Sequence, residues 1–255
     1  MDLGIRGKVA LVTGASSGIG EAVALGLARE GVRLAVAARR RERLEDVGRR
    51  ATAAGAQEAR AFTVDLTDAV SLQRLTASVE REMGPPELLI VNGGGPKPGT
   101  FIETAPADWD AAYALTLQSA LRLIHAVLPG MRARRWGRIV ALESVVVKQP
   151  FAGMVLSNAL RASVTAALKT LSAEVASEGI TVNTIATGLV DTDRLRSLYD
   201  TPAKMAAATA GIPMKRAASP AEYAPLVVFL CGEPAGYVTG QTISIDGGFT
   251  AGIFG

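Results

Sequence analysis

Hydroxyl and guanidinium side chains in the second half of the chain have the types and spacing of a small proton-handling site. Ser157 and Arg161 lie four residues apart in the stretch VLSNALR, which has a helical pattern, so both side chains share one helix face. Ser144 ends a separate apolar run, in ALESVV. A serine becomes a nucleophile only beside a base, and a guanidinium stays protonated in proteins. The expected chemistry is therefore hydrogen-bond donation beside a fixed positive charge.

Short apolar runs alternate with segments of helical periodicity, an order typical of an α/β protein. Because these runs are apolar throughout, they indicate strands buried on both faces of a parallel sheet. Strands are expected at 8–14, 32–39, 58–66, 86–94, 136–144, 179–187 and 241–248, and helices at 18–31, 42–55, 70–84, 107–134, 153–178 and 220–231. We therefore predict a single doubly wound (Rossmann) domain over residues 1–255, with about seven strands and helices on both faces. The segment 191–218 interrupts the pattern and is a candidate substrate lid.

A glycine-rich loop directly follows the first apolar run and opens the first predicted helix. Such glycines permit a tight turn and let phosphates approach the backbone, while the helix start supplies unpaired N–H groups. Because the strand and the helix are both present, the motif predicts a dinucleotide site; the alternative is a purely structural turn. The candidate contacts in TGASSGIG are Gly14, Ser16, Ser17, Gly18, Ile19 and Gly20.

The end of the second predicted strand indicates which dinucleotide is bound. Sites for NAD usually carry a carboxylate there for the ribose hydroxyls, whereas this chain has Ala38 followed by Arg39 and Arg40. A guanidinium favours the 2′-phosphate of NADP, and no acid is present to repel that phosphate. We therefore expect NADP(H) to be preferred over NAD(H), with Arg39 as the main contact and Arg40 as a further one. Arg41 and Arg43 are expected to be surface charges.

The composition argues against several other classes of protein. The 255 residues carry a formal net charge of +3 and are 49% hydrophobic, the balance of a globular protein with a sizeable core. The small excess charge and the absence of a lysine-rich run argue against a nucleic-acid partner. No apolar stretch reaches about 18 residues, so no membrane span is expected, and the default location is the cytoplasm. Because the only cysteine, Cys231, and the only histidine, His125, are expected to be packed in helices, no metal site is predicted.

Further motifs, taken with the glycine loop, resemble the classical short-chain dehydrogenase/reductase family over essentially the whole chain. TVDLTD matches the family segment that contacts the adenine, VNGGG resembles its Asn-Asn-Ala-Gly element, and ATGLVDT resembles its Pro-Gly segment beside the nicotinamide. The chain looks most like members named 3-oxoacyl-[acyl-carrier-protein] reductases. The resemblance adds the following cofactor contacts: Asp65, Leu66, Asn92, Gly93, Gly94, Gly188 and Thr192.

The resemblance also implies a catalytic Asn, a Ser and a Tyr-x-x-x-Lys pair, and this chain departs from three of those four positions. Ser144 matches the serine, but Thr116 falls at the asparagine, Ser157 at the tyrosine and Arg161 at the lysine. An alkyl hydroxyl is a far weaker acid than a phenol, whose pKa is about 10. Arg161 is expected to bind the nicotinamide ribose, as the family lysine does, and to stabilise negative charge on a substrate oxygen.

Three other side chains are candidates for the missing proton donor. Tyr113 lies one helical turn before Thr116, with simple packing in the helix as the alternative. Glu143 adjoins Ser144, but strand alternation is expected to send its side chain to the opposite face. Lys148 follows the end of the strand and is the preferred proton donor of the three. The alternative is that it is an ordinary surface lysine.

Two functions fit these residues. One is an NADP-dependent carbonyl reductase or alcohol dehydrogenase acting on a small-molecule carbonyl, with 3-oxoacyl thioesters among the candidates. The other is a binding protein that holds NADP(H) as a sensor or scaffold without turnover. The altered pair Ser157 and Arg161 favours the binding protein, whereas the retained Ser144 favours the enzyme, which is the interpretation adopted. The resemblance further implies a homo-oligomer, a dimer or a tetramer, assembled through the two long helices and the last helix and strand.

Overall fold

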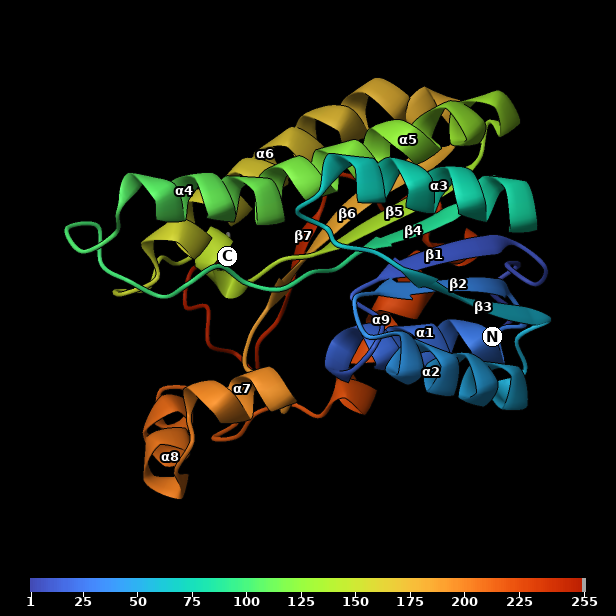
Figure 1. The fold of residues 1–255 in the computed structure, drawn as a ribbon. Coiled ribbons are helices and arrows are strands. Elements are labelled where there is room, and N and C mark those ends of the chain that lie inside the picture. Colours follow the sequence, from blue (N-terminus) through green and yellow to red (C-terminus); the bar gives the residue numbers. More distant parts are fainter. Residues whose placement is uncertain (254–255) are drawn as a thin grey trace.

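Seven parallel strands form one continuous sheet in the computed structural model, which describes residues 1–253 (Figure 1). The strand order is β3-β2-β1-β4-β5-β6-β7. Strands β2 and β3 are added on one side of β1 and the later strands on its other side, so the order of the strands switches between β1 and β4. The strands are β1 Val9–Thr13, β2 Arg33–Ala38, β3 Glu58–Thr63, β4 Leu88–Val91, β5 Gly137–Leu142, β6 Ile180–Thr187 and β7 Thr242–Ile245. The predicted single doubly wound domain is confirmed.

Helices cover both faces of the sheet. Helices α1, α2 and α9 lie on one face, and α3, α5 and α6 lie on the other (Figure 1). The helices are α1 Gly18–Arg29, α2 Arg41–Ala54, α3 Ala69–Met83, α4 Pro106–Ala112, α5 Ser119–Arg134, α6 Val155–Val175, α7 Asp193–Leu198, α8 Pro202–Ala210 and α9 Pro220–Leu230. Because all strands run the same way, their carboxyl ends meet at one edge, where the loops of the site gather.

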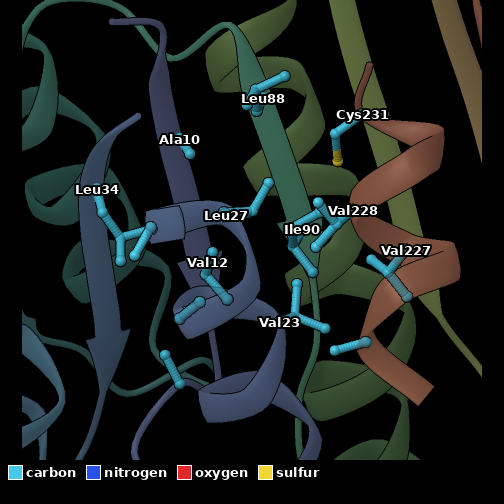
Figure 2. Packing of buried hydrophobic residues seen from close by; sticks show 14 of the residues in the cluster. Ala10, Val12, Val23, Leu27, Leu34, Leu88, Ile90, Val227, Val228 and Cys231 are labelled. Atoms are coloured by element: carbon cyan, nitrogen blue, oxygen red, sulfur yellow. The ribbon is translucent and has the colours of Figure 1, made fainter. Parts of the chain in front are cut away.

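The apolar runs become strands because both of their faces are covered. Strands β1, β4 and β5 are buried at every position, whereas the edge strand β7 is only partly buried. On one face, Val23 and Leu27 of α1 and Val227 of α9 pack against the sheet (Figure 2). Cys231 also belongs to this cluster and has no exposed surface, which confirms the prediction of a small buried hydrophobe. Burial raises the pKa of its thiol to about 12.

One long helix, Pro106–Arg134, is continuous but locally unwound into a π-helical turn at Tyr113–Gln118. Such turns are frequent at functional sites. By length and composition alone, the helix is long and apolar enough to cross a membrane. An 18-residue window within it has a mean hydropathy of 1.3, and 39% of that window is buried. This differs from the sequence expectation that no such stretch exists. His125 lies on the exposed side of this helix, so its expected packing is wrong: it faces outward because the buried stripe runs through Ile124 and Val127.

The segment 191–218, predicted as a lid, folds into the short helices α7 and α8. An isolated parallel bridge between Val190 and Ala218 closes the segment at its base. In Figure 1 these helices project from the carboxyl edge of the sheet, away from the two helix layers. Residues of α7, among them Leu195 and Leu198, line the cavities at that edge, so the segment is a wall of the candidate site.

Candidate active site

The glycine loop between β1 and α1 has the shape of a dinucleotide cradle. Gly14 and Gly18 adopt φ values of +60° and +62°, in the left-handed region that favours glycine. A Cβ on Gly20 would collide with the backbone carbonyl oxygen of Gly14 and would lie 2.6 Å from Nδ2 of Asn92, so the tight loop and the β4 end together exclude a side chain there. Asn92 in turn donates from Nδ2 to the carbonyl oxygens of Thr13 and Gly14, each at 3.3 Å. The residues present therefore fit a pyrophosphate at the start of α1.

The basic pair after β2 divides into two different environments. Arg40 donates from Nη2 to the hydroxyls of Ser16 at 3.1 Å and Ser17 at 2.7 Å, so its guanidinium lies over the glycine loop. Arg39 instead lies near enough to Asp65 for its charge to act on that carboxyl, whose Oδ1 accepts hydrogen bonds from the backbone N–H and the hydroxyl of Thr67. These bonds, with Arg39 nearby, hold the pKa of the Asp65 carboxyl below its usual value. Arg40 and the two serines thus form the donor cluster beside the loop.

The other predicted cofactor residues converge on the same edge of the sheet. Gly93 lies against Leu66, since a Cβ on Gly93 would stand 3.2 Å from Cδ1 of Leu66. Thr192 caps α7 through its hydroxyl, which accepts from the Leu195 N–H at 3.3 Å, and its methyl group packs against Gly18. A cavity of about 200 Å³ lies at this edge of the sheet. Eight of the predicted site residues line it: Ile19, Asn92, Gly93, Ser144, Ser157, Arg161, Gly188 and Thr192.

Two predicted residues lie at the margin of this cavity. A Cβ on Gly188 would stand 2.6 Å from the Cα of Asp246, so glycine is required there by the chain that follows β7. Gly94 lies beside Leu115 on the far side of the β4 loop, where a second, small cavity begins. Close chain packing thus requires glycine at position 188, whereas a side chain at position 94 would meet Leu115 only at an ordinary contact distance.

Ser157 and Arg161 share a face of α6, as their spacing predicts, and they are joined by a hydrogen bond. Nε of Arg161 donates to Oγ of Ser157 at 3.2 Å. Nη1 of Arg161 donates to the Glu143 carboxylate at 2.8 Å, and the two side chains are 13% and 4% exposed. Arg161 therefore connects a buried carboxylate to the hydroxyl at the edge of the cavity.

Glu143 lines the cavity together with Ser144, so the expectation that strand alternation sends it away from the site is wrong. Alternation does hold up to Leu142, which packs on the α1 side. The cavity, however, lies beyond the end of β5, where side chains from either face of the sheet can reach it. Burial raises the pKa of the Glu143 carboxyl, and the charge of Arg161 opposes that rise.

Ser144 and Ser157 both have an oxygen that already accepts a hydrogen bond. Oγ of Ser144 accepts from the Val146 N–H at 3.4 Å in a tight turn after β5, and Oγ of Ser157 accepts from Arg161. A hydroxyl that accepts one hydrogen bond keeps its own proton to donate elsewhere. Both hydroxyls line the cavity and can therefore donate to one oxygen atom inside it.

Thr116 lies in the π-helical turn and is 7% exposed. Within residues 1–253 its hydroxyl has no hydrogen-bond partner. It faces a small cavity of about 20 Å³, lined also by Glu143, Arg161 and Asn92, which is large enough for one water molecule. Thr116 thus lies behind Glu143 and Arg161 and outside the lining of the 200 Å³ cavity.

The two other candidate proton donors lie elsewhere. Tyr113 is 44% exposed, whereas Thr116 is buried, because the π-helical turn places them on different sides of the helix. Lys148 follows the turn Val145–Val147 and is absent from the described lining of the cavity. Glu143 is therefore the one of the three that reaches the site.

Sequence reasoning missed two polar features of this site. The phenol of Tyr223, fully buried on α9, hydrogen-bonds the hydroxyl of Thr187 at 2.6 Å, and Thr187 lines the cavity. Arg194 of α7 also lines the cavity and contacts the β4 loop. Arg194 lies two residues after Thr192, a predicted cofactor contact, and this closeness in sequence is a signal that could have identified it. No sequence signal joined Tyr223 to Thr187, because they are brought together only by the packing of α9.

Comparison with known proteins agrees with this geometry. A family model described as enoyl-(acyl carrier protein) reductase matches residues 14–250. Nodulation protein G of Azospirillum brasilense is 37% identical over 246 residues, covering 94% of this chain and 97% of that protein. A 3-oxoacyl-[acyl-carrier-protein] reductase of Vibrio cholerae is 33% identical over 254 residues, covering 96% and 98%. The chain belongs to the short-chain dehydrogenase/reductase family.

Solved structures of the same family share the whole fold. L-sorbose reductase of Gluconobacter frateurii, complexed with NADPH and L-sorbose, has a TM-score of 0.94 and 33% identity, covering 99% of this chain and 100% of that one. An actinorhodin polyketide ketoreductase variant with NADPH has a TM-score of 0.91 and 34% identity, covering 96% and 98%. This chain is a member of an oxidoreductase family, and these two structural neighbours were solved with NADPH.

Proposed function

We propose that the protein is an NADP(H)-dependent oxidoreductase that interconverts a small-molecule carbonyl and the corresponding alcohol. The observation that carries this is the pair of hydroxyls, Ser144 and Ser157, whose oxygens are already occupied by donors and whose protons are free for a substrate oxygen. Such donors stabilise the negative charge that develops on a carbonyl oxygen as it is reduced. A bound reduced nicotinamide would supply the hydride for the carbonyl carbon.

The residues of this chain would divide the remaining work. Ser144 and Ser157 hold the substrate oxygen, and water in the cavity supplies the proton that turns the alkoxide into an alcohol. Arg161 orients Ser157 and places a positive charge beside the oxygen, while Glu143 holds the guanidinium at 2.8 Å. A site of this kind lacks the phenol of a typical relative, so it works by charge stabilisation more than by a strong acid.

Preference for NADP(H) is supported by the cluster of Arg40, Ser16 and Ser17 at the end of β2, and Arg39 beside it adds positive charge. No acid stands directly after β2, where Arg39 and Arg40 come next, in contrast to the carboxylate that NAD sites use there. We propose that Arg40 makes the main contact with the 2′-phosphate. The sequence had favoured Arg39 for this role; in the structure Arg40 is the one joined to the loop serines.

Assembly as a dimer or tetramer and a cytoplasmic location stay proposals. The apolar helix Pro106–Arg134 supports self-association, since only 39% of its most apolar window is buried in the single chain. Light scattering after gel filtration measures the mass directly. A monomer at micromolar concentration would contradict the proposed assembly.

The test of function is NADPH oxidation against a panel of ketones, aldehydes and 3-oxoacyl thioesters. We expect turnover with at least one class, and Ser157→Ala should lower kcat about 100-fold as one oxyanion donor is lost. Ser163→Ala is the matched control, because Ser163 lies on the same helix and bonds only the Ala159 carbonyl. NADPH binding measured by fluorescence, with no oxidation of it across the panel, would instead indicate the sensor or scaffold.

The variant Ser157→Tyr/Arg161→Lys tests the origin of the site. Restoring the phenol and amine should raise reductase activity if the wild-type pocket is a modified form of the usual one. A double variant that binds NADPH but remains inert, beside an inert wild type, would show that the pocket is unsuited to carbonyls.

A further inference from the structure

Two arginines from different elements meet at the edge of the cavity. Arg194 projects from α7 to the β4 loop, where its Nη2 lies 3.5 Å from the carbonyl oxygen of Pro96. A Cβ on Gly95 would collide with the Arg194 guanidinium and would stand 3.4 Å from Nη2 of Arg161. Both guanidiniums therefore border the space that a side chain on Gly95 would occupy, and glycine leaves that space to them.

Positive charge exceeds negative charge in this cavity. Arg161, Arg194 and Glu143 are the charged side chains that line it within residues 1–253. Glu143 is already paired with Nη1 of Arg161. The two cations are close together, since both border Gly95, and burial and the charge of Arg161 lower the pKa of Arg194. One guanidinium charge is thus left for an anion that enters from outside.

The free donors point to a particular kind of anion. Within the described residues, Nη2 of Arg161 has no hydrogen-bond partner, since its Nε bonds Ser157 and its Nη1 bonds Glu143. Planar guanidinium forks match a carboxylate, which accepts two parallel hydrogen bonds. Because Arg161 is also bonded to Ser157 at 3.2 Å, a carboxylate on these donors would stand close to the oxygen that Ser157 holds.

An apolar cavity continues on the other side of Ser144. Its volume is about 360 Å³, and Phe151 and Phe249 lie in its wall with ring centroids 5.2 Å apart. No Asp, Glu, Lys, Arg or His belongs to the lining that the structure describes. The two cavities together therefore offer cations at one end, hydroxyls in the middle and apolar side chains at the other end.

We propose that the substrate is an oxo acid, with the carboxylate one or two carbons from the carbonyl and an apolar group beyond it. The carboxylate binds Arg194 and Nη2 of Arg161, and the apolar group enters the cavity of Phe151 and Phe249. This rests on the proposed function and adds the substrate class. The balanced reaction is oxo acid plus NADPH plus a proton giving the hydroxy acid and NADP⁺; the hydride goes to the carbonyl carbon and the proton to its oxygen.

The experiment compares 2-oxo-4-phenylbutanoate and 3-oxo-5-phenylpentanoate with their methyl esters, which keep the carbonyl and lose the charge. For wild type we expect kcat/KM to be about 10- to 100-fold higher for at least one acid than for its ester, the size of a charge-assisted contact. Arg194→Leu should remove most of that difference between acid and ester, and Arg194→Lys should restore part of it.

Arg196→Leu is the matched control. It lies on the same helix, but it pairs with Asp191 and its side chain is 61% exposed. It should leave the ratio between acid and ester unchanged. Calorimetric titration of each acid into the protein loaded with NADP⁺ supplies a readout that needs no turnover.

These measurements separate failure of the inference from failure of the proposed function. Turnover of esters with equal or lower rates for both acids would overturn the oxo-acid assignment and keep the reductase. An acid that binds more weakly to Arg194→Leu, without any NADPH oxidation, would support the carboxylate site and contradict the reductase. If Arg194→Leu raises the KM for NADPH equally with every substrate, Arg194 serves the cofactor phosphates and the inference is wrong.

Discussion

Replacing Arg161 by methionine should destabilise the fold, because it leaves the carboxylate of Glu143 buried without its ion-pair partner. At the observed separation of 2.8 Å, with an effective dielectric constant of about 20, the attraction between the charges is about 6 kcal/mol. Part of that attraction offsets the desolvation of the two groups. We therefore expect Arg161→Met to lower the free energy of unfolding by about 3–5 kcal/mol at pH 8.

The loss should depend on pH in a definite direction. Burial raises the pKa of Glu143 above its ordinary value, and removing Arg161 removes the charge that opposes this rise. The folded variant then holds a proton that the unfolded chain has released. Its penalty is absent below the unfolded pKa and grows as the pH rises through the folded pKa. Arg161→Met should thus be closer to wild type at pH 5 than at pH 8.

Urea unfolding followed by circular dichroism at the two pH values measures both effects. Arg161→Lys keeps the charge and should retain most of the stability. Glu143→Gln/Arg161→Met, which removes both charges, should recover at least half of the loss. A loss below about 1 kcal/mol would refute the assigned pairing. So would an equal loss at both pH values, or no recovery in the double variant.

Three further substitutions test the cofactor end and the α9 contact. Arg40→Ala should raise the KM for NADPH at least tenfold with little change in the KM for NADH. Arg41→Ala, at an exposed position, should change neither KM. Equal effects of Arg40→Ala on both cofactors would contradict the phosphate contact. Gly20→Ala should weaken NADPH binding measured by fluorescence, because its Cβ collides with the Gly14 carbonyl oxygen and meets Nδ2 of Asn92, whereas Gly48→Ala, with nothing within 4 Å, should not. Tyr223→Phe should lower stability in urea by about 1–2 kcal/mol, since it leaves the Thr187 hydroxyl without its bond; an unchanged midpoint would show that bond to be dispensable.

The position of Glu143 shows why a sequence pattern can place a residue wrongly. Alternation along β5 correctly separates Leu142 from its neighbour, but it says nothing about a cavity that begins where the strand stops. The pairing with Arg161 depends on the distance between β5 and α6, which are separated by a turn and a loop. Local periodicity carries no information about that distance.

Local features of the chain were enough for most of the scaffold and for part of the site. Strands apolar at every position predicted a sheet covered on both sides, the glycines of the first loop predicted a tight turn, and the spacing of Ser157 and Arg161 predicted one shared face. These inferences succeed because each depends on residues that are neighbours in sequence, where backbone geometry alone sets the direction of a side chain.

Tertiary structure alone decided which groups meet in the pocket. Arg194 reaches Gly95, Tyr223 reaches Thr187, and Glu143 reaches Arg161 from segments far apart in the chain. Each contact is fixed by how a helix packs on the sheet or how the 191–218 segment folds back over its edge. Because such packing sums many small contacts across the whole domain, no short stretch of sequence contains it.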